Sequence, residues 1–158
     1  MMIIIESLLK IFDRDLQKLE EEIRQYPNDE SLWQLSGEIK NTAGNLCLHL
    51  CGNLQHYIGA RLGRTAYVRD RDNEFAAKGL SKDQLVEEIQ RARQAVRETL
   101  ETLKPSIMDT DYPERINDQT MKVSHFLIHL ASHLNYHLGQ INYHRRILAP
   151  SGAPASVQ

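Results

Sequence analysis

The chain has 158 residues, a length that fits one domain built around one hydrophobic core. Its 19 basic and 21 acidic residues leave a net charge of −2, which gives no general electrostatic attraction to nucleic acid or to an anionic membrane. The opening MMIIIESLLKIF lacks the basic start and the cleavage site of a signal peptide, and no apolar run approaches the ~20 residues of a membrane span. We therefore expect a soluble, cytoplasmic protein with no nucleic-acid partner.

Apolar residues recur three or four positions apart in four segments, a spacing that predicts helices with one buried face. The first predicted helix covers about residues 3–26 and ends at Pro27. A short helical turn is expected around Trp33. The second predicted helix covers about residues 42–62, with Asn41 as its candidate N-cap.

The second predicted helix is rich in small residues, which let another helix approach closely, either within the bundle or across a dimer interface. These residues are Gly44, Cys47, Cys51, Gly52 and Gly59. The two cysteines lie four positions apart on one helix, a poor arrangement for a disulfide that suits a reducing compartment. They are about 200° from His49 around the helix, so we interpret them as packing residues and not as metal ligands.

Residues 63–80 form a long, charged connection that contains the sequence RDRDNEF. We interpret this sequence as a solvated loop whose charges pair with each other and in which only Phe75 packs on the protein. Binding of an anionic substrate is the alternative.

The remaining helices follow this connection. Ser81 and Gln84 have the spacing of a capping box and predict a third helix to about residue 103. A fourth helix is predicted over about residues 120–148, and a disordered tail over 150–158. The pattern as a whole predicts an all-α fold, a single four-helix-bundle domain over residues 1–149. Its long crossover between the second and third helices allows these two helices to run parallel.

Five of the seven histidines lie in the fourth predicted helix: His125, His129, His133, His137 and His144. A pair at positions i and i+4 points two imidazoles from one helical face toward a common point. His133 and His137 form such a pair and flank the apolar face of their helix, while His49 lies on the inner face of the second helix. Three imidazoles with an open position are typical of a catalytic zinc or nickel site. Hydrogen-bonded core histidines without a metal are the alternative, and His129 has the same spacing to His125 and to His133.

Two segments resemble a known superfamily. HLNYHLGQI (133–141) is similar to the last-helix signature of the DinB-like (YfiT-type) superfamily, in which a His-x-x-x-His pair precedes Gly-Gln. LCLHLCGNLQHYIG (46–59) is similar to the matching second-helix segment, and RDRDNEF resembles a branch known mainly as a domain of unknown function. The resemblance implies a four-helix bundle with a crossover between helices two and three. It also implies a divalent metal ion, zinc or nickel, held by His49, His133 and His137.

The same resemblance implies partners and an activity. Members of the superfamily often form homodimers, and some resemble thiol-dependent S-transferases or isomerases in which the metal activates a low-molecular-weight thiol. We therefore expect a metal-binding protein, with thiol transfer to a small electrophile as the favoured activity. The alternatives are a metal-dependent hydrolase and a non-catalytic dimeric bundle with a structural or vestigial metal. No carboxylate lies on the predicted inner faces of helices two and four, which leaves hydrolysis without a general base.

Three polar residues beside the predicted ligands have both a functional and a structural interpretation. Asn53 could orient a ligand or a water, or serve helix packing. Gln140 could hydrogen-bond to His137, or cap a neighbouring segment. Tyr57 could line a pocket, or pack half-buried. The best predicted entrance for a small thiol is the open end of the bundle beside His49, Asn53 and Tyr57.

Overall fold

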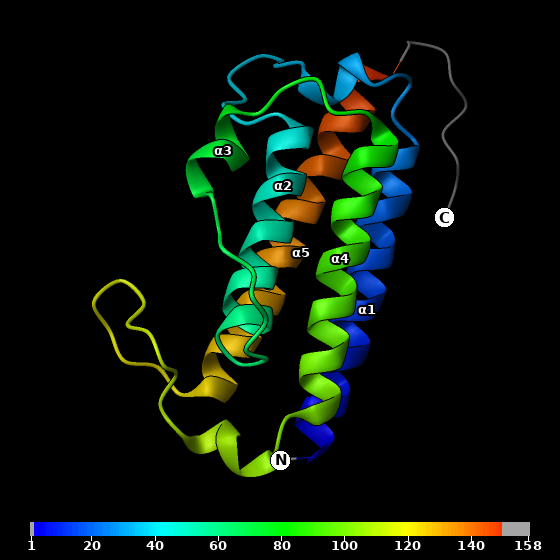
Figure 1. The fold of residues 1–158 in the computed structure, drawn as a ribbon. Helices are drawn as coiled ribbons and strands as arrows, with labels where there is room; N and C mark the ends of the chain where they lie inside the picture. The colour runs from blue at the N-terminus through cyan, green and yellow to red at the C-terminus, as the bar shows by residue number, and fades with distance from the viewer. Residues whose placement is uncertain (1, 150–158) are drawn as a thin grey trace.

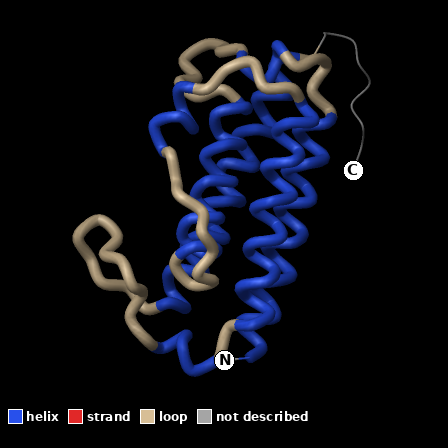
Figure 2. The backbone as a smooth tube through the Cα atoms, viewed as in Figure 1, coloured by secondary structure: helices blue, strands red, loops and turns tan. Residues whose placement is uncertain are grey.

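The computed structural model describes residues 2–149, and within them it contains helices and no strand (Figures 1 and 2). Four long helices form a bundle: α1 (Met2–Arg24), α2 (Ala43–Leu54), α4 (Lys82–Thr102) and α5 (Val123–Leu148). The shorter elements are η1 (Glu30–Trp33), η2 (Gln55–Ala60), α3 (Arg71–Ala76) and η3 (Pro105–Asp109). This architecture confirms the predicted all-α four-helix bundle.

The four long helices pack so that α1 and α2 each contact both α4 and α5. In Figure 1, α1 and α5 run in one direction along the bundle, and α2 and α4 run in the other. The connection between α2 and α4 returns along the length of the bundle, so these two helices are parallel. The crossover that the sequence allowed is therefore present.

The core is made of the apolar stripes that the periodicity predicted. Burying one large apolar side chain contributes roughly 1.5–3 kcal/mol to folding, so these positions supply most of the driving force. The buried stripe residues include Leu8, Phe12, Leu16, Leu19, Ile23, Leu46, Leu50, Leu85, Ile89, Ala92, Val96, Leu100, Phe126, Leu130 and Ile141. Residues 150–158, predicted to be a disordered tail, lie outside the described residues. None of the described helices is long and apolar enough to cross a membrane.

Capping residues begin two of the long helices. Ser81 and Gln84 form the predicted capping box at α4, each side chain accepting from the backbone N–H of the other. The N-cap of α2 is Thr42 rather than Asn41, because the Thr42 hydroxyl accepts from the backbone N–H of Asn45 at 3.2 Å.

The second predicted helix is continuous but changes its geometry part-way. α2 passes at Gln55 into the π-helical segment η2, where the Arg61 N–H donates to the His56 carbonyl at 3.0 Å. The sequence has no signature for this wider turn. Short π-helical segments inside α-helices are frequent near functional sites.

The connection over residues 63–80 differs from its prediction as a solvated loop. It contains the short helix α3, which begins after Asp70, whose side chain accepts from the Asn73 N–H at 3.0 Å. Glu74 in this helix is only 5% exposed, because its side chain turns toward α2. The interpretation of RDRDNEF as a loop that packs only Phe75 is therefore wrong.

The small residues of α2 serve packing within one protomer. A Cβ added at Gly44 would lie 2.7 Å from the Trp33 ring, and one added at Gly52 would lie 2.8 Å from Glu74 Cδ. Cys47 and Cys51 are buried free thiols, as predicted for packing residues. Close approach within one chain, one of the two predicted uses of these small residues, is therefore present.

Candidate metal centre

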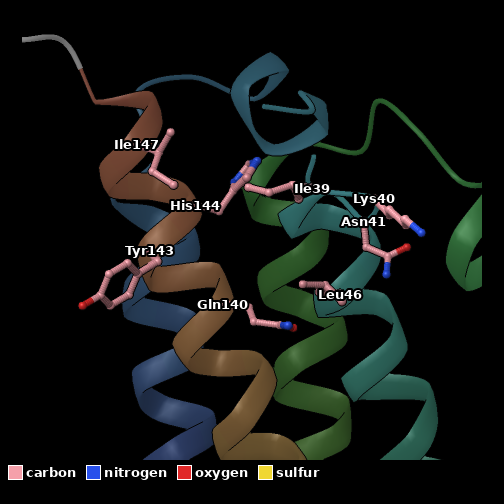
Figure 3. Close-up of a pocket in the computed structure, with 8 residues that line it drawn as sticks. All are labelled: Ile39, Lys40, Asn41, Leu46, Gln140, Tyr143, His144 and Ile147. Atoms are coloured by element: carbon pink, nitrogen blue, oxygen red, sulfur yellow. The ribbon is translucent and has the colours of Figure 1, made fainter. Parts of the chain in front are cut away.

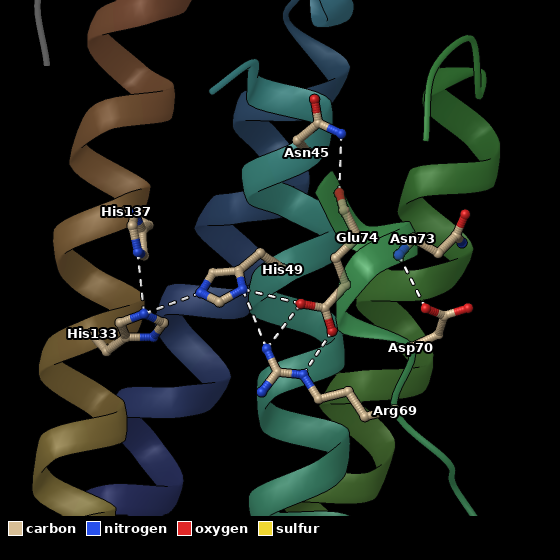
Figure 4. Close-up of polar contacts among 8 residues, drawn as sticks. All are labelled: Asn45, His49, Arg69, Asp70, Asn73, Glu74, His133 and His137. Atoms are coloured by element: carbon tan, nitrogen blue, oxygen red, sulfur yellow. Dashed lines mark hydrogen bonds and ion pairs between the residues drawn. The ribbon is translucent and has the colours of Figure 1, made fainter. Parts of the chain in front are cut away.

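Three histidines from two helices meet on the flank of the bundle beside α3 (Figure 4). His49 comes from α2, and His133 and His137 come from successive turns of α5. His133 Nε2 lies 3.3 Å from His49 Nε2 and 3.1 Å from His137 Nε2. One ligand atom from each of the three lies within 4.8 Å of the other two, and this cluster could hold a metal ion.

The His49 ring is oriented by a carboxylate on its far side. Its Nδ1 lies 3.1 Å from Glu74 Oε2, and the ring is only 10% exposed at the side chain. Arg69 Nη2 also lies 3.3 Å from this nitrogen, but that Arg69 group is engaged by Glu74 Oε2 at the shorter distance of 2.8 Å. A carboxylate only accepts hydrogen bonds, so we assign the proton to Nδ1, which donates it to Glu74. The Nε2 lone pair of His49 is thereby left free to face the other two histidines.

His137 is oriented in the same manner by an amide. Its Nδ1 lies 2.6 Å from Gln140 Oε1, an acceptor one turn further along α5. Of the two interpretations of Gln140 from the sequence, the structure has the hydrogen bond to His137, which again leaves the Nε2 lone pair free. His133 Nδ1 is buried and has no hydrogen-bond partner among the described residues, so only the Nε2 side of that ring makes polar contacts.

The donor set and its spacing fit a divalent metal ion. Imidazole nitrogens that bind a tetrahedral zinc ion at about 2.0–2.1 Å lie about 3.3 Å from one another. The two Nε2 separations at His133, 3.3 and 3.1 Å, are close to that value. Neutral lone pairs this close repel one another unless a cation or a proton lies between them. The nitrogen separations of the three rings therefore match those of imidazole ligands around a zinc ion.

The electrostatic environment keeps two of the three rings neutral. Burial, together with the neighbouring His137 and His49, lowers the pKa of His133 to about 4. Burial also lowers the pKa of His137, and the hydrogen bond to Gln140 offsets only part of that shift. Only neutral imidazole binds a metal, so both rings are in the binding form at neutral pH.

An ion pair that the sequence analysis missed supports His49. Arg69 Nε donates to Glu74 Oε1 at 2.7 Å, and Arg69 Nη2 donates to Oε2 at 2.8 Å. Burial raises the pKa of Glu74, but the hydrogen bonds from His49 and Arg69 outweigh it and the net shift is downward. Glu74 is therefore a fixed anion that holds His49 in one tautomer.

The backbone of α3 and the surface of α2 place this carboxylate. Asn45 Nδ2 donates to the backbone carbonyls of Glu74 and Ala77, at 3.0 and 2.9 Å, and so ties α3 to α2. Gly52 leaves room for the Glu74 carboxylate, which any side chain at that position would overlap. Phe75 packs against His49, with ring centroids 5.0 Å apart.

The fold and this cluster agree with a family match over most of the chain. The model of the DinB superfamily matches residues 11–141. The chain belongs to the DinB superfamily. The histidines at positions 49, 133 and 137 all lie within the matched range.

A solved structure shows the same DinB fold. The crystal structure of a DinB-like protein from Bacillus cereus ATCC 10987 superposes with a TM-score of 0.72 over 90% of this chain and 91% of that chain. The two sequences are 20% identical, so the similarity concerns the fold. No curated protein matches this DinB superfamily chain.

The other four histidines of this DinB protein lie outside the cluster. His125 and His129 are exposed on α5, and His129 stacks between Phe126 and His133. His56 contacts Glu114, with 3.3 Å between Nε2 and Oε2. The remaining histidine is buried: His144 Nδ1 lies 2.8 Å from the Tyr26 hydroxyl, and its Nε2 lies 2.9 Å from the Gln34 carbonyl oxygen.

The two other residues singled out near the ligands have different surroundings. Asn53, one turn after His49, is 7% exposed, and its Oδ1 has no partner among residues 2–149. Tyr57 is half-buried, and the Arg69 guanidinium lies 5.7 Å from its ring centroid. Neither residue belongs to the three-histidine cluster.

Proposed function

We propose that this DinB protein binds one divalent metal ion, zinc or nickel, through His49, His133 and His137, and uses it to transfer a small thiol to an electrophile. The observation that supports this proposal most strongly is that the Nε2 atoms of the three histidines lie close together. In His49 and His137, a hydrogen-bond acceptor at Nδ1 leaves the Nε2 lone pair free. Within the described residues no fourth side chain joins the cluster, so an exchangeable position would remain. Zinc and nickel both suit imidazole ligands.

A metal ion at such a site lowers the pKa of a thiol that binds to it and so supplies a thiolate near neutral pH. The chain's own cysteines do not provide this thiol. Both are buried, and the hydrogen bond with Cys47, together with burial, raises the pKa of Cys51. The nucleophile therefore has to be an external small thiol.

Thiol transfer is supported better than hydrolysis by the state of the nearest carboxylate. Both oxygens of Glu74 accept hydrogen bonds, from Arg69 and from His49, and its pKa is below the ordinary value. A carboxylate in this state is a weak base for activating water. Glu74 therefore gives hydrolysis little support as a general base.

The activity is tested by incubating zinc- or nickel-loaded protein with cellular thiols and a chromogenic aryl halide. We expect metal-dependent formation of a carbon–sulfur bond, with release of halide and of the thiol proton. A His137→Ala variant is expected to react no faster than the thiol alone. Equal rates for wild type and His137→Ala with every thiol would favour a non-catalytic helical module.

We also propose that two copies associate through the outer face of α5. Ile128 and Tyr136 are 55% and 66% exposed on that face, and a Cβ added at Gly139 would meet nothing within 4 Å. A glycine inside a helix lowers the stability of the helix by about 1 kcal/mol relative to alanine. Close packing of a second helix against Gly139 would offset this loss. Solution scattering at tens of micromolar should give the mass of a dimer; the mass of a monomer would contradict this proposal.

A further inference from the structure

A cavity of about 350 Å³ lies between the C-terminal end of α5, the start of α2 and the segment before α2 (Figure 3). Ile39, Leu46 and Ile147 supply apolar walls. Lys40, Asn41 and Gln140 supply polar groups. Its volume is within the range of small-molecule sites, about 300–1,000 Å³.

The cavity lies one helical turn from the three histidines. Leu46 precedes His49 by three residues on α2, and Gln140 follows His137 by three residues on α5. α2 and α5 run in opposite directions, so both residues lie on the same side of the cluster, displaced by about 4.5 Å along the helices. Gln140 also contacts His137 directly, at 2.6 Å. One residue is thus both part of the cavity wall and a partner of a candidate metal ligand.

The cavity and the entrance predicted for a small thiol lie on opposite sides of His49. The predicted entrance is beside Asn53 on α2 and Tyr57 on η2, both of which follow His49, whereas the cavity is beside Leu46, which precedes it. The cavity forms because the segment before α2 folds over the end of α5, an arrangement that helical periodicity does not encode.

The charge of the lining favours an anion. Lys40 is its only ionised side chain, and no hydrogen bond or ion pair from the rest of residues 2–149 engages the Lys40 ammonium. His144, which also lines the cavity, is neutral, because burial lowers its pKa. The N-terminus of α2 adds the positive end of a helix dipole beside Asn41.

We propose that this cavity binds the electrophilic substrate of the metal centre, a small molecule with an apolar body and one carboxylate. The apolar walls hold the body, Lys40 and the start of α2 attract the carboxylate, and the reactive end lies toward Gln140 and His137. The inference rests on the proposed function, since it assigns a substrate class to that site. A low-molecular-weight cellular thiol carries several charged groups, so it fits these apolar walls less well than the electrophile does.

The test compares three ligands that share one apolar body and differ in charge: 4-phenylbutanoate, 4-phenylbutan-1-ol and 4-phenylbutylamine. Each is titrated into zinc-loaded protein and followed by the amide shifts of ¹⁵N-labelled protein, without any thiol. We expect the butanoate to bind most tightly and the amine most weakly, with shifts concentrated in residues 39–46 and 140–147. Lys40→Gln should weaken butanoate binding by about two- to fivefold, the effect of an exposed ion pair, and leave alcohol binding unchanged.

Two exposed isoleucines of α5 provide a matched pair of variants. Ile147 lines the cavity and is 57% exposed, whereas Ile128 is 55% exposed and does not line it. Ile147→Trp should fill the cavity and abolish butanoate binding, and Ile128→Trp should leave it intact. Because both positions are exposed, neither change disturbs the core. Ile128 also lies on the face proposed for the dimer, so Ile128→Trp shows in addition that butanoate binding does not depend on that face.

Three results would overturn the inference. They are equal binding of all three ligands, unchanged binding in Ile147→Trp, and butanoate-induced shifts that lie outside residues 39–46 and 140–147. Specific butanoate binding without any thiol conjugation would sustain the inference and count against the proposed function. Zinc-dependent conjugation that is unchanged in Ile147→Trp would support the proposed function and contradict the assignment of this cavity to the electrophile.

Discussion

Replacing His133 with alanine is expected to abolish tight zinc binding. The loss of affinity should exceed the roughly 10–100-fold effect of removing a residue that only orients a ligand. His133 Nε2 lies between the other two Nε2 atoms, 3.3 Å from one and 3.1 Å from the other, so its removal separates the remaining pair. No other side chain of the described residues joins this cluster to replace it.

The affinity is measured by competition with a chromophoric chelator, and His129→Ala provides the matched control. His129 is an exposed histidine one turn earlier on the same helix, and its ring stacks on His133 without joining the cluster. Zinc at 100 times its dissociation constant should stabilise wild type and His129→Ala by about 2.7 kcal/mol, and His133→Ala far less. Equal zinc affinity in His133→Ala and wild type would contradict the ligand assignment.

Replacing Gly52 with alanine is expected to lower zinc affinity by about 10–100-fold, although position 52 does not touch the metal centre. The added Cβ would lie 2.8 Å from Glu74 Cδ and would displace the carboxylate that holds His49 Nδ1. Without that acceptor His49 can take the other tautomer, in which Nε2 carries the proton and cannot bind a metal.

Gly139→Ala is the matched control for this change, because it also replaces a helical glycine, but at a position where a Cβ meets nothing within 4 Å. It should keep the zinc affinity of wild type. Glu74→Met provides a second route if Gly52→Ala folds poorly, because it removes the acceptor of His49 Nδ1 at a similar side-chain volume. A folded Gly52→Ala or Glu74→Met variant with wild-type zinc affinity would show that Glu74 does not position His49.

The helices and the three histidines could be predicted because their signals are local. Long apolar stripes repeat with the helical period, and the His133–His137 spacing places both rings on one face. Gly139-Gln140, through the resemblance, selected this pair over the equally spaced pairs that contain His129. The structure places Gln140 against His137, which gives that selection a physical basis.

The supporting carboxylate could not be predicted, because its contact joins residues 25 positions apart through a six-residue helix. A helix that short carries too few turns to show a period. Two residues in the sequence indicate parts of this arrangement. Asp70 caps α3, and Gly52 leaves space on α2 that another side chain can fill. Neither one identifies Glu74 as the residue that covers Gly52.

The cavity beside Gln140 was unpredictable for a similar reason. It needs the segment before α2 to fold over the end of α5, and that segment has few apolar residues in a regular pattern. The π-helical turn after Leu54 also has no local signature. Periodicity and the resemblance therefore located the candidate ligands, but neither Glu74, which orients His49, nor the cavity beside them.

Zinc K-edge X-ray absorption of the untagged protein tests most directly whether three imidazoles of this chain bind one metal ion. Protein loaded with one equivalent of zinc should show three nitrogen neighbours at about 2.0–2.1 Å, with the outer-shell scattering pattern of imidazole rings. Any further ligand should be a light atom that added thiol replaces with one sulfur at about 2.3 Å. Zinc that shows sulfur neighbours without added thiol, or fewer than two imidazoles, would contradict the assignment of His49, His133 and His137.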